Sequence, residues 1–470
     1  MLEGLEITEV LFSRFENENR FDSEYFRKVF MKADKYIKSK NHFNIGDYYK
    51  VTDGEHGSVI FQESGIKYLT AENIKKGYVD ISKIRYVDKG VDERNARARV
   101  ETGDVLISIK GTLGEIAVAE DWLLPANMNR DVAIIKPQVE NIPSEYLALF
   151  LISEYGALQS LRGGSGGVQQ MITLERLRKF VIPSFSNSFY RKVTTIYNHA
   201  KRCRILSQQA YAQAETLLLE TLGLNNFKPT QEAVNIKSFK ESFLSSGRLD
   251  AEYYQLKYEE IENKVKSSDA WSTLGKQLLK IDTGEYSPDY YSKDEKDELV
   301  FYIRSTNIKG GQIIFDDNYY VEKNKFVRIA KKGNIVTARV GSIGVFGEIR
   351  EDIDGSVYSD NVLCFQLPAN FIPSVYTLLF NSIYYFELID RLARGSVQQR
   401  LNQETLKDLI IPIIDIQTQQ QISNLIEKSF RLKKQSEQLL DLAKTAVEMA
   451  IEEDEEVAMN FISTKLKDLK

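Results

Sequence analysis

Residues 190–222, YRKVTTIYNHAKRCRILSQQAYAQAETLLLETL, predict one long helix around which the rest of the chain is organised. At a rise of ~1.5 Å per residue this helix would be roughly 50 Å long. Small and apolar residues recur in two interleaved rows with a seven-residue period, the spacing that keeps one seam of a helix facing a partner helix. One row is Val193, Ala200, Ser207 and Ala214, and the other is Ile196, Cys203, Ala210 and Leu217.

The same two rows return between Gln419 and Ile451, 229 positions later, since Ile422 follows Val193 by 422 − 193 = 229. Leu432 and Leu439 then stand where the first copy has Cys203 and Ala210. We expect an antiparallel pair of helices in which small positions on one face leucine on the other. The alternative is two unrelated core helices. The rows of the second copy are Ile422, Ser429, Ser436 and Ala443, interleaved with Leu425, Leu432, Leu439 and Ala446.

Length and composition indicate several domains and limit the classes of function. A chain of 470 residues exceeds the usual size of a single core, and its 43% hydrophobic content suffices for two or more. Its apolar runs are too short to span a bilayer, and we expect a cytoplasmic protein. The two cysteines and three histidines predict neither a disulfide framework nor a metal site. A net charge of −5 argues against a uniformly basic nucleic-acid coat.

Further motifs occur once in each half of the chain, in the same order. Tyr68-Leu-Thr-Ala-Glu-Asn-Ile-Lys matches Tyr302-Ile-Arg-Ser-Thr-Asn-Ile-Lys, a strand leading into a polar turn. Gly103-Asp-Val-Leu-Ile-Ser-Ile-Lys-Gly-Thr-Leu-Gly matches Gly333-Asn-Ile-Val-Thr-Ala-Arg-Val-Gly-Ser-Ile-Gly, a strand between glycine turns. The Gly-x-x-Gly element lacks the Gly-Lys-Ser/Thr ending of a nucleotide-binding loop, which argues against that function.

A glycine-rich loop with two adjacent glutamines closes each half. The sequence pairs Arg162-Gly-Gly-Ser-Gly-Gly-Val-Gln-Gln with Arg394-Gly-Ser-Val-Gln-Gln-Arg, and each is followed by a leucine and an Ile-Pro pair. Flexible glycine with amide and guanidinium groups suits close approach to phosphates or base edges. The alternative is a connecting loop whose glutamines cap backbone groups.

Together these motifs resemble the DNA-specificity subunits of type I restriction-modification systems, over about residues 10 to 455. The resemblance implies an α+β fold with two similar target-recognition domains, each containing a mixed or antiparallel sheet with helices. It also implies that two long antiparallel coiled-coil helices join these domains in a pseudo-two-fold internal repeat. The expected ranges are 1–185 for the first recognition domain, 186–232 for the first spacer helix, 233–414 for the second recognition domain, and 415–470 for the second spacer helix with an acidic C-terminal tail.

The resemblance further implies a non-catalytic subunit that binds a split site in double-stranded DNA. Its expected partners are two modification (methyltransferase) subunits and restriction (translocase and nuclease) subunits, in a complex with site-specific deoxyribonuclease and adenine methyltransferase activities that acts in phage defence. S-adenosylmethionine, ATP and Mg would be bound by those partners, and we expect no cofactor, metal or catalytic residue in this chain.

Two other classes of function remain open on the sequence. One is a DNA methyltransferase or nuclease in its own right, against which no glycine-rich cofactor fingerprint and no Asn/Asp-Pro-Pro-aromatic motif occurs. The other is a coiled-coil scaffold without a DNA role, which leaves the duplicated glutamine loops unexplained. Candidate DNA-binding side chains are the polar groups of the repeated turns and loops: Lys110, Thr112, Arg162, Gln169, Gln170, Arg304, Ser305, Asn307, Arg339, Ser342, Arg394, Gln398, Gln399 and Arg400.

Overall fold

The computed structural model describes residues 6–12, 22–138, 142–165, 170–232, 234–268, 270–293, 298–315, 319–393 and 400–468. The chain divides into two compact units. Unit 1 consists of Met1–Ile205 and Leu432–Lys470, and unit 2 consists of Leu206–Arg431. Each unit therefore combines one stretch of each long helix with an α+β body. No helix in the described ranges is long and apolar enough to cross a membrane.

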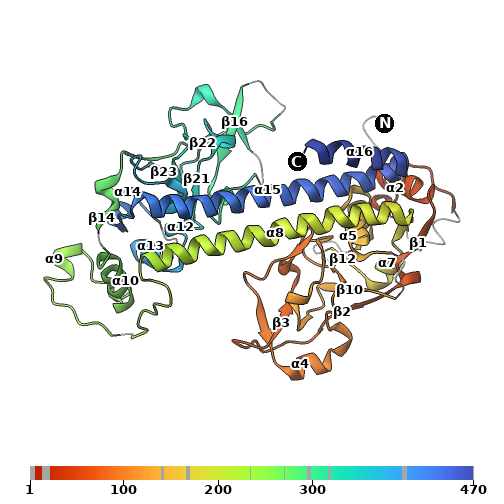
Figure 1. Ribbon diagram of the computed structural model, residues 1–470, viewed down its shortest axis with the longest axis horizontal. Helices are drawn as coiled ribbons and strands as arrows, with labels where there is room; N and C mark the ends of the chain where they lie inside the picture. Colours follow the sequence, from red (N-terminus) through yellow and green to blue (C-terminus); the bar gives the residue numbers. More distant parts are fainter. Residues whose placement is uncertain are drawn as a thin grey trace. The chain divides into compact units, whose positions relative to one another are not determined.

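The two longest helices, α8 (Asn187–Thr221) and α15 (Ile416–Glu452), correspond to the two seven-residue repeats (Figure 1). Both begin three residues before the predicted starts, which were Tyr190 and Gln419. Polar side chains just before each helix explain the difference: Ser186 Oγ accepts a hydrogen bond from the Phe189 amide (3.2 Å), and Asp415 Oδ1 accepts one from the Thr418 amide (2.9 Å). Such N-caps satisfy amides that have no partner within the helix.

The two helices pair in opposite chain directions, and small residues meet at the seam. In unit 2 the Oγ atoms of Ser207 and Ser429 are 3.1 Å apart and buried. In unit 1 Ser436 Oγ donates to the Ala200 carbonyl (2.7 Å). Both pairs have the same residue sum, 207 + 429 = 200 + 436 = 636, so one antiparallel register applies in both units. Adding 229 to Ala200 gives Ser429, and adding 229 to Ser207 gives Ser436, so the repeat relates each contact to the other. This relation is expected of a pseudo-two-fold repeat.

Most residues of the two rows are buried in this pairing. Leucines at the outer edge of the seam are half-buried instead, because the straight helix drifts away from a strict seven-residue period. Leu218 and Ile426 follow the half-buried Leu217 and Leu425 and are themselves buried. The buried members of the rows are Val193, Ile196, Ala200, Cys203, Ser207, Ala210, Ala214, Ile422, Ser429, Ser436, Leu439, Ala443 and Ala446, and the half-buried ones are Leu217, Leu425 and Leu432.

Unit 1 contains a four-stranded antiparallel sheet in the order β2-β10-β7-β8 and a three-stranded mixed sheet in the order β6-β3-β9. Two-stranded pairs β1-β13, β4-β5 and β11-β12 complete it. Helix α5 is apolar on nearly all sides because it crosses the core. The strands are β1 (His42–Asn44), β2 (Tyr49–Asp53), β3 (Ile66–Leu69), β4 (Ile74–Lys75), β5 (Tyr78–Val79), β6 (Arg85–Val87), β7 (Val105–Ser108), β8 (Ile116–Val118), β9 (Ala126–Met128), β10 (Val132–Pro137), β11 (Gly164–Ser165), β12 (Met171–Ile172) and β13 (Val181–Pro183). The helices are α2 (Lys28–Lys38), α3 (Ile45–Tyr48), α4 (Lys89–Arg94), α5 (Ser144–Ile152), α6 (Glu154–Gly163), α7 (Leu174–Arg178) and α16 (Glu455–Asp468).

Unit 2 repeats this topology with a four-stranded sheet β15-β23-β20-β21, a mixed sheet β19-β16-β22, and the pairs β14-β24 and β17-β18. Its strands are β14 (Trp271–Thr273), β15 (Lys280–Thr283), β16 (Leu299–Ile303), β17 (Ile308–Lys309), β18 (Gln312–Ile313), β19 (Tyr320–Glu322), β20 (Ile335–Ala338), β21 (Phe346–Glu348), β22 (Val357–Tyr358), β23 (Val362–Gln366) and β24 (Ile410–Pro412). Its helices are α9 (Phe243–Ser246), α10 (Leu256–Lys266), α11 (Leu274–Gln277), α12 (Pro373–Phe380), α13 (Ile383–Leu392) and α14 (Gln403–Lys407).

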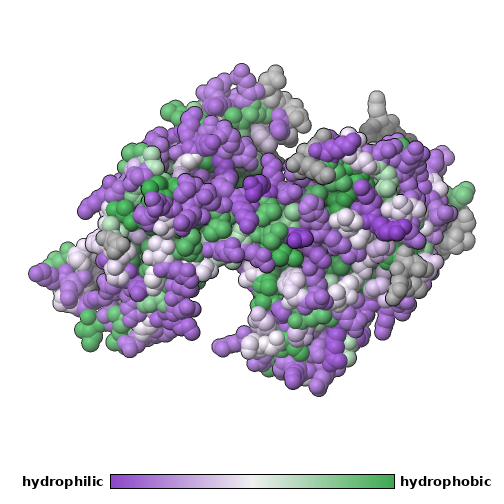
Figure 2. All heavy atoms as spheres, in the orientation of Figure 1, coloured by the Kyte–Doolittle hydropathy of each residue, from purple (hydrophilic) through white to green (hydrophobic). Residues whose placement is uncertain are grey.

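The C-terminal segment differs from the predicted acidic tail. Residues after α15 form helix α16, in which Ala458 and Ile462 are fully buried in the core of unit 1. Glu455 at the start of this helix accepts a hydrogen bond from the Ser186 amide (3.0 Å). The acidic run from Glu452 to Glu456 spans the end of α15, the connection and the first residues of α16, so a packed helix follows it. Hydrophilic side chains cover much of the surface drawn in Figure 2, with apolar patches between them.

Candidate nucleic-acid interface

The glycine turn after the central strand and the end of the glutamine loop are neighbours in each unit. In unit 1 the Ile172 amide donates to the Ile109 carbonyl (2.9 Å), and the backbones of Lys110 and Met171 form an isolated antiparallel β-bridge. In unit 2 the Leu401 amide donates to the Arg339 carbonyl (3.0 Å), and the backbones of Val340 and Arg400 form the same kind of β-bridge. The structure therefore joins two motifs that are about 60 residues apart in the sequence.

A polar cavity of about 480 Å³ lies in unit 1 between the Gly111-Thr112 turn and the turn after β3. Three cationic side chains line it, namely Lys75, Arg85 and Lys110. Lys110 Nζ is 3.8 Å from Asp131 Oδ1, and this pair is partly exposed. At this distance the two charges attract each other without a direct hydrogen bond. The other lining residues are Thr70, Ala71, Glu72, Gly111, Thr112, Asn129 and Asp131.

The hairpin that carries Lys75 is positioned by a long helix. Gly77 connects β4 and β5 with φ of +84°, and a Cβ atom there would lie 2.8 Å from Leu440 Cδ2. In unit 2 Gly311 has φ of +81° and lies next to Tyr211 Oη. Tyr211 and Leu440 are equivalent, because 440 − 211 = 229. The positive φ favours glycine at both positions, and at Gly77 a side chain would also displace Leu440.

An arginine lies over an aromatic ring beside the polar turn in each unit. Arg85 is 4.8 Å from the Phe61 ring centroid in unit 1, and Arg304 is 3.9 Å from the Tyr319 ring centroid in unit 2. Tyr319 also packs against Tyr290, with ring centroids 4.9 Å apart. Stacking holds each guanidinium plane in place, which limits its freedom before it meets a base or phosphate.

Asn307 has a structural role that the sequence did not predict. It is fully buried, its Oδ1 accepts from the Arg304 amide (2.9 Å), and its Nδ2 donates to the Ile314 carbonyl (3.1 Å). Asn73 makes the same contacts in unit 1, with the Thr70 amide and the Asp80 carbonyl (both 2.9 Å). The shared Asn-Ile-Lys motif therefore fixes the turn through its asparagine. The assignment of Asn307 to DNA is corrected, because both ends of its amide are occupied within the fold.

Arg162 also departs from its prediction as a loop residue facing DNA. It belongs to α6 and is only 7% exposed. Its Nε donates to the Tyr25 carbonyl, and its Nη1 contacts Asp34 Oδ2, both at 2.8 Å. Two of its three nitrogen atoms thus connect α6 to Tyr25 and to Asp34 in α2, which holds the side chain inside the fold.

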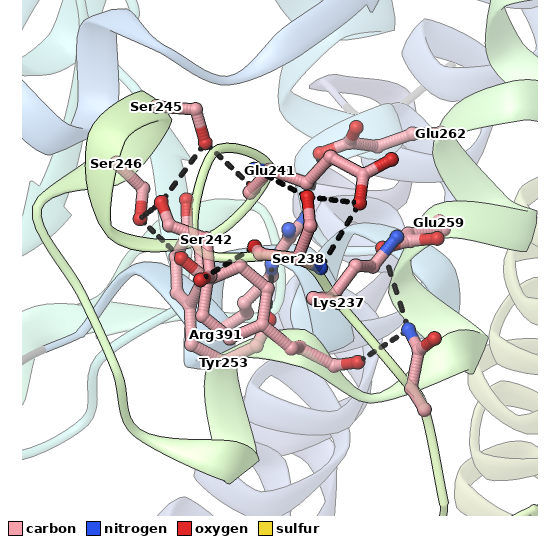
Figure 3. A network of polar contacts seen from close by, with 12 residues as sticks. Lys237, Ser238, Glu241, Ser242, Ser245, Ser246, Tyr253, Glu259, Glu262 and Arg391 are labelled. Atoms are coloured by element: carbon pink, nitrogen blue, oxygen red, sulfur yellow. Dashed lines mark hydrogen bonds and ion pairs between the residues drawn. The ribbon is translucent and has the colours of Figure 1, made fainter.

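The sequence pairing of Arg162 with Arg394 is likewise wrong, because the structural equivalent of Arg162 is Arg391. Arg391 Nε donates to the Tyr253 carbonyl (2.8 Å), and its Nη1 contacts Glu262 (2.7 Å) (Figure 3). The offset 391 − 162 = 229 agrees with that of the helices. The shorter glycine run of the second copy placed a different arginine opposite Arg162 in the sequence comparison.

The remaining predicted residues of the described ranges lie at loop surfaces. Arg339 is half-buried, and its Nη1 contacts the Asp360 carbonyl (3.3 Å). Ser305 is half-buried, and the exposed ones are Thr112, Gln170, Ser342 and Arg400. Gln169, Arg394, Gln398 and Gln399 lie outside the described residues.

The sequence analysis missed Lys75 and Arg85 as candidate residues. The signal for Lys75 was present, since Asn-Ile-Lys occurs in both copies and places Lys309 at the equivalent position. Arg85 carried no such signal, because its strand pairs with β3 only in three dimensions. Within the described ranges no group of three or more His, Cys, Asp or Glu side chains could hold a metal ion. The side chains of the site are hydrogen-bond donors suited to binding, and the turns that carry them extend from the sheets.

The comparison with known families identifies the chain. The family model of the type I restriction modification DNA specificity domain matches residues 27–184 and again residues 273–441. These ranges cover more than half of the chain, and the protein belongs to this family.

Individual relatives are distant. A stretch of 165 residues, 34% of this chain, is 23% identical to the type I restriction enzyme EcoBI specificity subunit of Escherichia coli; the match spans 35% of that protein, about a third of its length. The type I restriction-modification system S subunit from M. genitalium is 12% identical, with a TM-score of 0.44 over 87% of this chain and 94% of that chain. The HsdS subunit from Thermoanaerobacter tengcongensis is 14% identical, with a TM-score of 0.29 over 88% of this chain and 97% of that chain.

Proposed function

We propose that this chain is the non-catalytic subunit that recognises a bipartite DNA site for a type I restriction-modification complex. The observation that carries the proposal is the duplication of a complete set of elements: each family match contains the mixed sheet, the polar turn and the paired loops. Two such sets predict two half-sites, each contacted by one set. The proposed domains are residues 1–185 and 233–414, with 186–232 and 415–470 as spacers.

Recognition within each half-site is assigned to exposed and half-buried polar groups on or beside the turns. In unit 1 these are Lys75, Arg85, Lys110, Thr112 and Gln170. In unit 2 they are Arg304, Ser305, Arg339, Ser342 and Arg400. Arginine and lysine donate to guanine N7 and O6 or to phosphates, whereas hydroxyl and amide groups serve several base edges.

The partners proposed for the chain are two modification subunits and the restriction subunits, which would bind S-adenosylmethionine, ATP and Mg. The equivalence of the two helix repeats supports two quasi-equivalent docking surfaces for the modification subunits. Such a complex would act on DNA in the cytoplasm. Native mass spectrometry of the co-purified complex tests the stoichiometry, and a single modification subunit per chain would contradict quasi-equivalent docking.

Methylome sequencing tests the DNA function directly. Cells that carry this chain with its modification partner should contain a methylated motif made of two short defined sequences separated by an undefined gap. Cells that lack only this chain should lose that motif. A motif that persists without the chain, or transferase activity of the purified chain alone, would contradict the proposal.

A further inference from the structure

A second cavity, of about 270 Å³, opens in unit 1 between α2, β1, α6 and the segment from α7 to β13. It shares no lining residue with the cavity at the polar turn. Among the described residues, four cationic side chains line it, from Lys38, Arg162, Arg176 and Lys179, together with one carboxylate, that of Asp34. This balance favours an anion.

Arg162 provides a buried donor whose third nitrogen is unused. Its Nε and Nη1 hold the Tyr25 carbonyl and Asp34, and its guanidinium lies 4.0 Å from the Tyr25 ring centroid. Nη2 is buried and has no hydrogen-bond partner among the residues that the structure describes. A buried donor without an acceptor is costly and uncommon. An anion in the cavity that Arg162 lines would supply the acceptor.

The other cations are placed around the same space. The Arg176 guanidinium lies 4.5 Å from the Tyr25 ring centroid, and Lys38 Nζ is 4.0 Å from Asp34 Oδ2. Lys179 pairs at 2.9 Å with Glu175, and both side chains are well exposed. Exposed pairs of this kind are weak, so Lys179 can turn toward a bound anion. Two guanidinium groups suit the tetrahedral oxygens of phosphate.

Unit 2 retains the scaffold of this cavity but not its charge. Arg391, Tyr253 and Glu262 repeat the clamp of Arg162, Tyr25 and Asp34 (Figure 3), and Lys266 takes the place of Lys38. At the offset of 229, however, Thr405, Asp408 and Trp271 stand where unit 1 has Arg176, Lys179 and His42. In unit 2 the contacts of Arg391 with Tyr253 and Glu262 form without these cations. The cations of unit 1 are therefore not needed to hold Arg162 in place.

We propose that this cavity of unit 1 binds a phosphate group, either as a free phosphate anion or as a phosphodiester of bound DNA. Arg162 Nη2 and Arg176 donate to the phosphate oxygens, and Lys38 and Lys179 add positive charge. This site is additional to the proposed recognition turns, and it can be tested in the absence of DNA.

Equilibrium dialysis of the full chain against radiolabelled inorganic phosphate, at constant ionic strength set with chloride, measures the binding. The test variant is Arg176→Thr combined with Lys179→Asp, which installs the residues of unit 2. Loss of two cations should weaken binding at least about tenfold, since charge-assisted hydrogen bonds to phosphate oxygens are stronger than neutral ones. The control is Lys428→Ala with Lys467→Ala, which removes two exposed lysines that line neither cavity and should bind phosphate as the native chain does.

A second arm identifies the source of the phosphate. Duplex DNA that contains the methylated motif is added to the phosphate-bound chain. Displacement of phosphate assigns the cavity to the DNA backbone, whereas simultaneous binding assigns it to a free anion. Absence of one-to-one phosphate binding by the native chain, or equal binding by the Arg176→Thr, Lys179→Asp variant, would overturn the proposal whatever the outcome for DNA recognition.

Discussion

Ser207 and Ser429 meet at the seam of the helix pair in unit 2, with their Oγ atoms 3.1 Å apart and both side chains buried. The equivalent pair in unit 1 is Ala200 and Ser436, where one hydroxyl donates to a carbonyl. Small side chains at these positions let the helix backbones approach closely. The seam thus combines tight packing with satisfied polar groups. These contacts give both units the same antiparallel register, in which the numbers of paired residues add up to 636.

Leucine in place of Ser429 should destabilise the helix pair by about 1–3 kcal/mol, because the added carbons have no room at the seam and Ser207 Oγ loses its partner. The matched control is Gln208→Leu, at an exposed position of α8. Thermal unfolding followed by circular dichroism measures both. Equal stability of the two variants would mean that the seam is not closely packed.

Glu348 should make stability depend on pH. Burial raises its pKa from 4.5 to about 7, while the nearby Arg350 opposes the shift. An acid whose pKa is raised on folding prefers the protonated form in the folded state. Ionisation of Glu348 therefore lowers the free energy of unfolding. This loss of stability grows as pH rises from about 4.5 and is complete above about 7.

Replacing Glu348 with glutamine removes this titration. The variant should be more stable than the native chain at pH 8 by up to about 3 kcal/mol, and the difference should shrink toward pH 5. Calorimetric unfolding at pH 5, 6, 7 and 8 measures the difference. A gain that is the same at every pH would show that Glu348 does not titrate in this range.

Lys75 and Arg85 should contribute to DNA affinity mainly through charge. The double variant Lys75→Ala, Arg85→Ala should weaken binding of the assembled complex to its site and reduce the slope of log K against log salt by about 1 for each lost phosphate contact. Fluorescence anisotropy between 50 and 200 mM salt measures this. Lys467→Ala on α16 is the control, and an equal loss in the control would mean that only overall charge matters.

The helices are predicted to set the gap between the half-sites. Seven residues inserted after Ser207 and seven before Ser429, the residue that it contacts, preserve the seam and lengthen both helices by ~10 Å, equal to about three base pairs at ~3.4 Å each. Methylome sequencing should then show the same half-sites with a longer gap. An unchanged gap with retained methylation would place the control of spacing elsewhere.

The sequence predicted the elements that repeat and the elements with strong periodicity. The rows beginning at Val193 and Ile422 identified α8 and α15, because a seven-residue period is a direct consequence of helix geometry. The buried strand after Gly103 and its copy after Gly333 were identified from apolar runs between glycines. Repetition made short motifs informative, although each alone is weak.

Side-chain roles at the candidate site were harder to predict. Arg162 and Asn307 are polar and lie next to glycine or turn residues, so the sequence could not distinguish an exposed donor from a buried one. Their burial depends on contacts with Tyr25 and Ile314, which only the fold brings close. Arg85 was missed for the same reason. Pairing of strands distant in sequence has no local signature.

The most direct test of the central claim exchanges residues 1–185 for the matching domain of another member of the family and maps methylation in cells that carry the hybrid. If each unit reads one half-site, one defined sequence should change while the other sequence remains. A change in both half-sites, or in neither, in cells where the hybrid still directs methylation would contradict independent reading by the two domains.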